Sequence, residues 1–308
     1  MVSVLILYMS VGISLDTNNM NTHILRPEPS YPTYPPYHTG KYLEQYFFDF
    51  YQRNVDRFGK RQYIPVFWTN CYVNGVQEGW GDKVDFNEMQ RELNRLDPNG
   101  SYFTVCQHDD APMHILPTNT FVFSAGGNVV GSNTIPIPLI CGRLAPQKKQ
   151  EKEYLASFVG STTHSIRNKM AESLRDHSDV YVSTKGWDPK VKYDQIEDFV
   201  SASTRSKFVL CPRGYGPSSF RLYEAMQLDA VPVYISDRFW LPWQHELNWE
   251  EFCVLIPEDQ IPNIHSILSS IDDDTYEKMK QKIQEIYENY FTMEGMSAKI
   301  MQMLEILE

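Results

Sequence analysis

The stretch KFVLCPRGYGPSSFRLYEAMQLDAVPVYISD, residues 207–237, decides the fold. Its pattern predicts a buried strand over 207–211, a loop rich in glycine and proline, a helix over 218–228 and a second strand over 231–235. A strand, a crossover helix and a further strand form a right-handed unit of a parallel sheet. The stretch therefore predicts an α/β protein.

The loop and the start of this helix have the composition of an anion-binding site. Free backbone N–H groups at a helix N-terminus attract negative charge, and Gly216, Ser218 and Ser219 lie at this start. Arg213 and Arg221 bring guanidinium groups that suit a diphosphate. The pattern therefore indicates a bound phosphate compound.

Glu224 follows Arg221 by three positions, so both side chains share one helix face. There the carboxylate of Glu224 could accept the two hydroxyls of a ribose while Arg221 binds phosphate. The alternative is an ordinary strand–helix–strand unit with a glycine turn, a serine cap and a salt bridge. The stretch lacks the glycine pattern of dinucleotide-binding folds and the lysine of a P-loop.

Strands and helices alternate on both sides of this stretch. The first half is predicted to contain helices over 42–58 and 85–96 and strands over 64–72, 102–107 and 121–124. The second half is predicted to contain strands over 154–159, 180–183 and 253–256 and helices over 165–176, 194–203, 261–271, 274–290 and 297–307.

The polar, proline-containing segment 141–153 is typical of a domain linker. We therefore expect two Rossmann-like domains that face each other across a cleft, residues 1–145 and 146–308. The last helix is expected to pack back on the first domain.

Length and charge restrict the function. A chain of 308 residues with 42% hydrophobic positions is long enough for two packed domains. The net charge of −11 argues against a nucleic-acid partner, because such proteins need a basic surplus. The last 63 residues hold 14 acidic and 4 basic side chains, so the acidic surplus lies mainly outside the predicted anion site.

The cysteines and the N-terminus bear on the cellular location. Five widely spaced cysteines without a CxxC pair indicate free thiols in a reducing compartment. The apolar segment 2–15 is too short for a membrane span, so it is expected to be a buried first strand. We therefore expect a cytoplasmic protein, with the lumen of the secretory pathway as the alternative if residues 1–15 are a targeting remnant.

The segment 206–258 closely resembles the exostosin family of glycosyltransferases. That family has a pattern like S-x-F-x-L-x-P-x-G-x(4)-S-x-R-x(2)-E-A, followed by a proline-containing strand, an aspartate and L-P-[FW]. The matching positions are Ser206, Phe208, Leu210, Pro212, Gly214, Ser219, Arg221, Glu224, Ala225, Pro232, Val233, Asp237, Leu241, Pro242 and Trp243. LNWEEFCVLIPE (247–258) is also similar to a family motif, and weaker likeness extends over 64–72, 105–112, 135–140 and 154–174.

The chain departs from the family pattern at two positions. Asp229 stands where the family usually has glycine, and Asn248 stands where it has aspartate. No anchor or stem sequence is recognised before the first predicted domain, so we expect a minimal, soluble form such as those of large viruses or bacteria.

The resemblance implies an inverting glycosyltransferase with the GT-B arrangement of two Rossmann-like domains. Such an enzyme moves a sugar, with xylose, galactose and glucuronic acid as candidates, from a UDP-sugar to a hydroxyl of an oligosaccharide or glycoprotein glycan. It implies that the second domain binds the nucleotide sugar and the first the acceptor. No cofactor or metal is expected.

The resemblance also adds residues to the nucleotide site. Gly160 and Arg167 lie in a second strand–turn–helix segment whose family equivalent faces the nucleotide. The alternative for Arg167 is a surface arginine. Asp237 follows the strand at 231–235, at the edge where open α/β sheets bind ligands, although a helix-capping role is an alternative.

A general base is expected on the acceptor side. His108, Asp109 and Asp110 follow the strand at 102–107 and therefore face the cleft. Any of the three could take the proton of the acceptor hydroxyl, with the two aspartates favoured, or the segment could be a plain turn. A metal site formed with His114 is the alternative, although no metal-binding helical pair is present.

Trp68 and Trp80 are candidates for stacking on acceptor sugar rings, with a place in the core as the alternative. Two other functions stay open. The chain could be a glycan- or nucleotide-binding protein of the same fold without catalysis, or a metal-dependent hydrolase built on the residues around His108.

Overall fold

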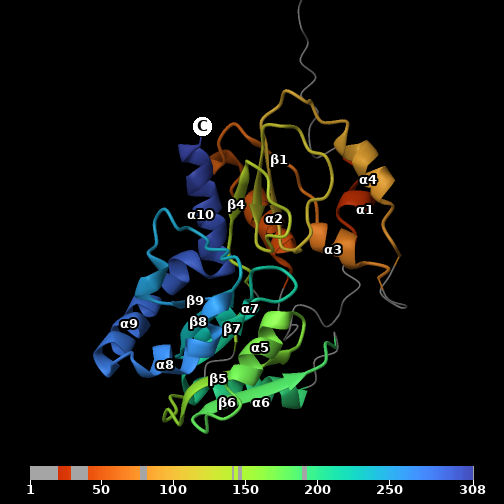
Figure 1. Cartoon of the computed structure of the whole chain (residues 1–308). Coiled ribbons are helices and arrows are strands. Elements are labelled where there is room, and N and C mark those ends of the chain that lie inside the picture. The colour runs from red at the N-terminus through yellow and green to blue at the C-terminus, as the bar shows by residue number, and fades with distance from the viewer. Residues whose placement is uncertain are drawn as a thin grey trace, which may run out of the picture.

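Two parallel β-sheets organise the chain, one in each half (Figure 1). The computed structural model describes residues 20–28, 41–76, 82–140, 142–144, 148–188 and 193–307. Helices accompany both sheets, and the first half lies above the second in this view. The arrangement confirms the predicted α/β class with two Rossmann-like domains of the GT-B type.

The first sheet has the strand order β1-β2-β3-β4, and all of its pairs are parallel. Its strands are β1 Gln62–Tyr63, β2 Tyr102–Cys106, β3 Thr120–Ser124 and β4 Thr134–Pro136. Its half contains the helices α1 Thr22–Leu25, α2 Leu43–Arg53, α3 Trp68–Val73 and α4 Phe86–Leu93, and the 3₁₀ helix η2 Val55–Arg57.

The second sheet has the order β6-β5-β7-β8-β9 and is also parallel throughout. Its strands are β5 Tyr154–Ser161, β6 Val180–Lys185, β7 Ser206–Pro212, β8 Val231–Ser236 and β9 Val254–Pro257. The chain runs from β5 outward to β6 and then returns to the other side of β5 with β7. The strand order therefore reverses between β5 and β7, which is where doubly wound sheets bind their ligands.

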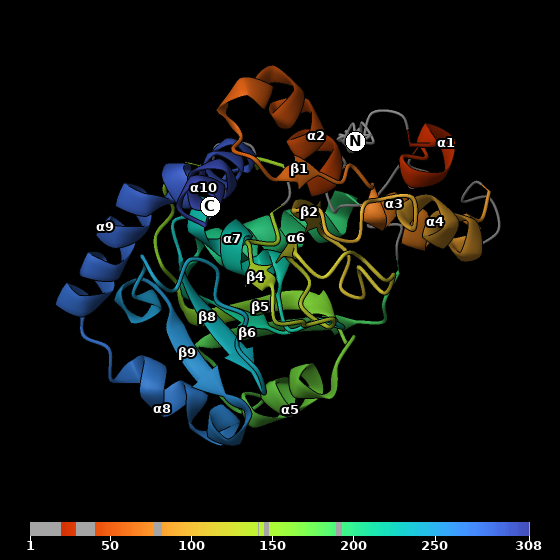
Figure 2. The ribbon, with the colours of Figure 1, turned by 90° about the horizontal axis from the view of Figure 1, so that it is seen from above.

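The helices of the second half include one that reaches the first half. They are α5 Ser165–Ser173, α6 Tyr193–Thr204, α7 Phe220–Gln227, α8 Ile264–Ser269, α9 Asp273–Tyr290 and α10 Met293–Ile306, with the 3₁₀ helices η3 Trp249–Glu251 and η4 Glu258–Asn263. Helix α10 lies beside both α9 and α2 (Figure 2). There Tyr46 donates a hydrogen bond of 2.7 Å to Glu294, and one apolar core continues through both halves.

The segment at 64–72 was predicted as a strand, and that prediction is wrong. Strand β1 ends at Tyr63, and helix α3 occupies most of the apolar run. Pro65 has no N–H to continue a sheet ladder, and all six residues of α3 are buried. An apolar run that is buried on every side does not distinguish a strand from a helix. The helix predicted from residue 85 is present as α4, and Asp85 caps it by accepting from the N–H groups of Asn87 and Glu88.

Both departures from the family pattern have a structural account. Asp229 has a φ of +56°, a left-handed conformation that glycine adopts without strain. Its carboxylate forms an ion pair with Lys280, with 2.9 Å between Oδ1 and Nζ. Asn248 caps η3 by accepting from the N–H of Glu250, a role that an aspartate would fill equally well.

No helix within the described ranges is long and apolar enough to cross a membrane. The apolar segment 2–15, predicted to be a strand, lies outside the described residues. The same holds for Trp80 and for Cys141. The four cysteines that are described, Cys71, Cys106, Cys211 and Cys253, are free and buried.

Candidate functional site

Three loops meet at the carboxyl ends of β5, β7 and β8 in the second sheet. The loop after β5 carries His164 and leads into α5, whose first turn carries Arg167. The loop after β7 carries residues 213–219, and Asp237 follows β8. Because the strand order reverses between β5 and β7, this edge is the expected ligand site of the domain.

Arg167 is partly buried where these loops converge. Its guanidinium donates hydrogen bonds to the carbonyl oxygens of Ser161 at 2.7 Å, Arg213 at 2.9 Å and Pro212 at 3.2 Å. No carboxylate of the described residues forms an ion pair with it. Burial, and then the charge of Arg221, lower the pKa of Arg167 to about 10. A cation held by neutral oxygens beside a second cation is a favourable place for an anion.

Arg221 lies on the first turn of α7 and pairs with Glu224. Its Nε also donates to the carbonyl of Val159 at 3.2 Å, and its guanidinium lies 3.8 Å from the ring centroid of Phe199. Glu224 is fully buried. In this arrangement its carboxylate orients Arg221. That Glu224 also accepts ribose hydroxyls stays a prediction.

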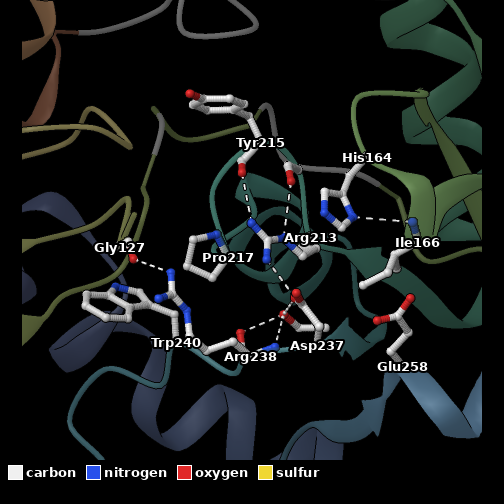
Figure 3. Close-up of polar contacts among 12 residues, drawn as sticks. Gly127, His164, Ile166, Arg213, Tyr215, Pro217, Asp237, Arg238, Trp240 and Glu258 are labelled. Atoms are coloured by element: carbon white, nitrogen blue, oxygen red, sulfur yellow. Dashed lines mark hydrogen bonds and ion pairs between the residues drawn. The ribbon is translucent and has the colours of Figure 1, made fainter. Parts of the chain in front are cut away.

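Arg213 shapes the loop rather than facing solvent. Its Nη1 donates to Asp237 at 2.6 Å and its Nη2 to the carbonyl of Tyr215 at 2.9 Å (Figure 3). Burial alone would raise the pKa of Asp237, but the hydrogen bond and charge of Arg213 lower it. Arg213 and Asp237, predicted as ligands, therefore brace two neighbouring loops.

The start of α7 was predicted to bind anions, and its residues are tightly packed. Ser219 is the N-cap residue with an extended backbone, and Ser218 and Ser219 are both buried. Gly160 is buried inside β5, where a Cβ would lie 2.8 Å from an atom of the Phe158 ring. Gly160 is thus needed for packing in β5, and its contact with the nucleotide stays a prediction.

The side chain of Asp109, in the first half, lies against the loop of residues 213–219 in the second half, which we call the glycine loop. A Cβ on Gly216 would lie 2.0 Å from Oδ1 of Asp109, so only glycine allows this approach. Burial, and then the charge of Asp110, raise the pKa of Asp109 to about 7, although a hydrogen bond from the Gly216 N–H opposes this. Asp109 is thus a carboxyl group that changes charge near neutral pH.

The neighbours of Asp109 are held by further contacts. Asp110 accepts from Asn128 at 2.9 Å, and its own N–H donates to Nδ1 of His108 at 3.2 Å. Burial lowers the pKa of His108, which favours its neutral form. Because Nδ1 of His108 accepts a hydrogen bond here, Nε2 carries the proton in that form.

The two halves are joined on the other side of Gly216. Trp240 donates through its indole N–H to the carbonyl of Ser124 at 3.0 Å, and Arg238 donates to the carbonyl of Gly127 at 2.5 Å. A Cβ on Gly127 would lie 2.7 Å from the Trp240 ring. These contacts fix the loop that follows β3 against the glycine loop.

Comparison with known families identifies this architecture. The exostosin GT47 domain matches residues 93–271, more than half of the chain. The chain belongs to the exostosin GT47 family.

Relatives of this GT47 chain include two plant proteins and one from an insect. A probable glycosyltransferase of Arabidopsis thaliana is 30% identical over 139 residues, 45% of this chain and 28% of that protein. A probable glucuronosyltransferase of rice, Oryza sativa subsp. japonica, is 44% identical over 84 residues, 27% of this chain and 20% of that protein. Exostosin-1 of Drosophila melanogaster is 28% identical over 158 residues, 46% of this chain and 21% of that protein. The matches thus span between a fifth and somewhat over a quarter of these relatives.

Among solved structures, that of TarM aligns with this GT47 chain with a TM-score of 0.43 and 12% identity, covering 71% of this chain and 52% of that one. The pneumococcal O-GlcNAc transferase GtfA, solved with UDP and GlcNAc, aligns with a TM-score of 0.40 and 12% identity, covering 76% of this chain and 50% of that one.

The metal site considered around His108 in this GT47 chain has poor geometry. The nitrogens of His114 contact the hydroxyl of Tyr72 at 3.0 Å and the carbonyl of Phe86 at 3.2 Å. In the described ranges, the group of metal-ligating side chains that do converge is His177, Asp179 and His265, on α5, β6 and α8 or beside them. The residues around His108 are not part of it.

Trp68 presents no exposed face for sugar stacking. It is fully buried and donates its indole N–H to Thr104 at 2.9 Å. Trp68 is a core residue, which was the alternative to sugar stacking that the sequence left open. Tyr215, which sequence reasoning passed over, has the exposed ring at this edge instead. Its place between two glycines in the loop was the available signal.

Proposed function

We propose that this chain is an inverting glycosyltransferase that moves a sugar from a UDP-sugar to a hydroxyl of a glycan acceptor. The observation that carries the proposal is the approach of Asp109 to Gly216, which brings a carboxyl group with a pKa of about 7 to the loop before α7. A general base works best when its pKa is near the working pH. Family membership supports the reaction class.

The diphosphate of the donor would lie at the reversal point between β5 and β7. Arg167 has no carboxylate partner among the described residues, and Arg221 adds a second positive charge nearby. These two groups and the N–H groups at the start of α7 would stabilise the charge that develops on the leaving UDP. Glu224 and Asp237 would keep Arg221 and Arg213 in place.

The base would act from the opposite half. Asp109 would take the proton of the acceptor hydroxyl as that oxygen attacks the anomeric carbon, while the bond to UDP breaks. One displacement without a covalent intermediate inverts the anomeric centre. In this scheme the first domain, 1–145, holds the acceptor, the second, 146–308, holds the donor, and no metal or cofactor takes part.

The donor sugar is proposed from the relatives. Several are named probable glucuronosyltransferases, which makes UDP-glucuronic acid the first donor to test. UDP-xylose and UDP-galactose are the next candidates. The acceptor would be an oligosaccharide or a glycoprotein glycan.

The test incubates the purified chain with each UDP-sugar and a panel of p-nitrophenyl glycosides, and measures released UDP and glycosylated product. We expect transfer from one donor, and a loss of at least about 100-fold in kcat for D109N. Nucleotide binding without release of UDP from any donor would instead identify a binding protein without catalysis. The conservative variant D198N, on α6, is the control for a carboxylate outside the site.

A further inference from the structure

Tyr215 has the one exposed side chain of the loop residues 213–219. Its side chain is 62% exposed, whereas Arg213 is 8%, Ser218 3% and Ser219 5% exposed. A large aromatic ring in water is unfavourable unless something covers it. This ring lies at the edge where the two halves meet, next to Gly216 and therefore next to Asp109.

The backbone of Tyr215 is held firmly. Nη2 of the buried Arg213 donates to its carbonyl at 2.9 Å, and the ring points away from this contact (Figure 3). A Cβ on Gly214 would lie 3.2 Å from Nη2 of Arg167, and one on Gly216 would clash with Asp109. The tight packing on both sides leaves the loop little freedom, so the ring is a preorganised surface.

The hydroxyl end of Tyr215 lies near the carboxylates of the opposite half. A hydrogen bond to Asp110, followed by the charge of that residue, raises the pKa of Tyr215. Asp110 is in turn held by Asn128 at 2.9 Å. The backbone of Tyr215 is thus fixed by the second half, and its hydroxyl faces the carboxylates of the first, while the residue stays largely open to solvent.

We propose that Tyr215 is the stacking platform for the pyranose ring of the acceptor sugar. The inference rests on the proposed function and deepens it. The apolar C–H face of a pyranose packs well on an aromatic ring, and a ring carried by a firmly held backbone loses little entropy on binding. The occupant is the acceptor rather than the donor, because the residue next to Tyr215, Gly216, lies against Asp109, and the attacking hydroxyl has to reach that carboxylate.

Direct binding tests the platform without turnover. Saturation-transfer NMR is measured with cellobiose, xylobiose, galactobiose and chitobiose in the presence of UDP. For the disaccharide that binds the wild type, we expect Y215A to weaken binding about three- to tenfold, the loss of one aromatic contact, and Y215F to retain most of it. The control is Y181F, which removes a tyrosine hydroxyl that donates to Asp198 at 2.8 Å on β6 and α6.

Kinetics separate acceptor from donor. Y215A should raise the KM for the acceptor by the same factor and leave the KM for the donor and its slow hydrolysis by water unchanged. Unchanged acceptor binding in Y215A, binding of none of the four disaccharides by the wild type, or a rise in the donor KM alone would each overturn the inference. Disaccharide binding that depends on Tyr215 in a chain that transfers no sugar would count against the proposed function and leave the platform standing.

Discussion

The carboxylate of Asp109 lies against the backbone of Gly216, although the two residues lie in loops that follow strands of different sheets. The approach is so close that a single added methyl group at Gly216 would lie 2.0 Å from Oδ1. The contact places an ionisable group of one half at the loop of the other half that is proposed to bind phosphate. It therefore couples the arrangement of the two halves to the protonation of the candidate base.

G216A tests this coupling. The added Cβ must displace either Asp109 or the loop, because it would also lie 2.9 Å from the carbonyl oxygen of Gly126. We expect kcat for sugar transfer to fall about 100-fold, as misplacement of a reacting group by about 1 Å can do. The matched control is G186A, since a Cβ there meets nothing within 4 Å. Equal activity of G216A and G186A would contradict the proposed geometry.

The raised pKa of Asp109 predicts how activity depends on pH. The base must be ionised to accept a proton, so kcat/KM should rise with pH through an apparent pKa of about 7. D109N should lack this rise along with nearly all activity. A profile of wild-type transfer that is flat between pH 5.5 and 8.5 would exclude Asp109 as the base.

The raised pKa of Asp109 also predicts how stability depends on pH: stability should fall over the pH range in which activity rises. Because the folded state holds the proton of Asp109 more tightly than the unfolded state, stability should fall as pH rises from about 4 to about 7. D109N should not show this fall, so at pH 8 it should be more stable than the wild type by about 1–3 kcal/mol. Urea denaturation of both proteins at pH 5 and pH 8 measures the difference. A D109N protein that is less stable than the wild type at pH 8 would argue against a strained carboxylate.

Variants of Arg167 and Arg213 should differ in what they lower: the affinity for UDP in R167A and the stability of the fold in R213A. R167A removes a cation that has no carboxylate partner among the described residues, so we expect UDP to bind about tenfold or more weakly. R213A leaves Asp237 without its partner and frees the loop, so it should lower the stability by about 1–3 kcal/mol. Calorimetry with UDP and thermal unfolding on both variants distinguish the two. The assignment would be reversed if R213A alone lost UDP affinity.

The sequence predicted much of the second half, for physical reasons that the structure makes clear. Residues 207–237 contain an apolar run, a loop with glycine and proline, an amphipathic helical segment and a second apolar run. The local sequence alone therefore specifies β7, α7 and β8. The first half was harder, because α3 is buried on all sides and its sequence has no period that separates helix from strand.

The candidate site was predictable as a set of residues but not as contacts. The candidate anion-binding residues follow from the loop pattern, and Asp109 from its place after a buried strand. Which of them face ligand depends on burial that arises only on folding. Glu224 is buried and paired with Arg221, Trp68 lies in the core, and Tyr215 is exposed. The local sequence does not predict the burial of any of these three residues.

Asp229 offers a test of backbone strain outside the site. A residue with a side chain at φ +56° is strained by about 1–2 kcal/mol relative to glycine, the residue that the family usually has there. Asp229 offsets this by pairing with Lys280 at 2.9 Å and by accepting, through its carbonyl, a bond of 2.7 Å from Lys152. D229A and D229G both lose the ion pair, but only glycine relieves the strain, so D229G should be more stable than D229A by about 1 kcal/mol. Chemical denaturation of the two variants side by side measures this difference, and equal stabilities would show that the left-handed conformation costs nothing at this position.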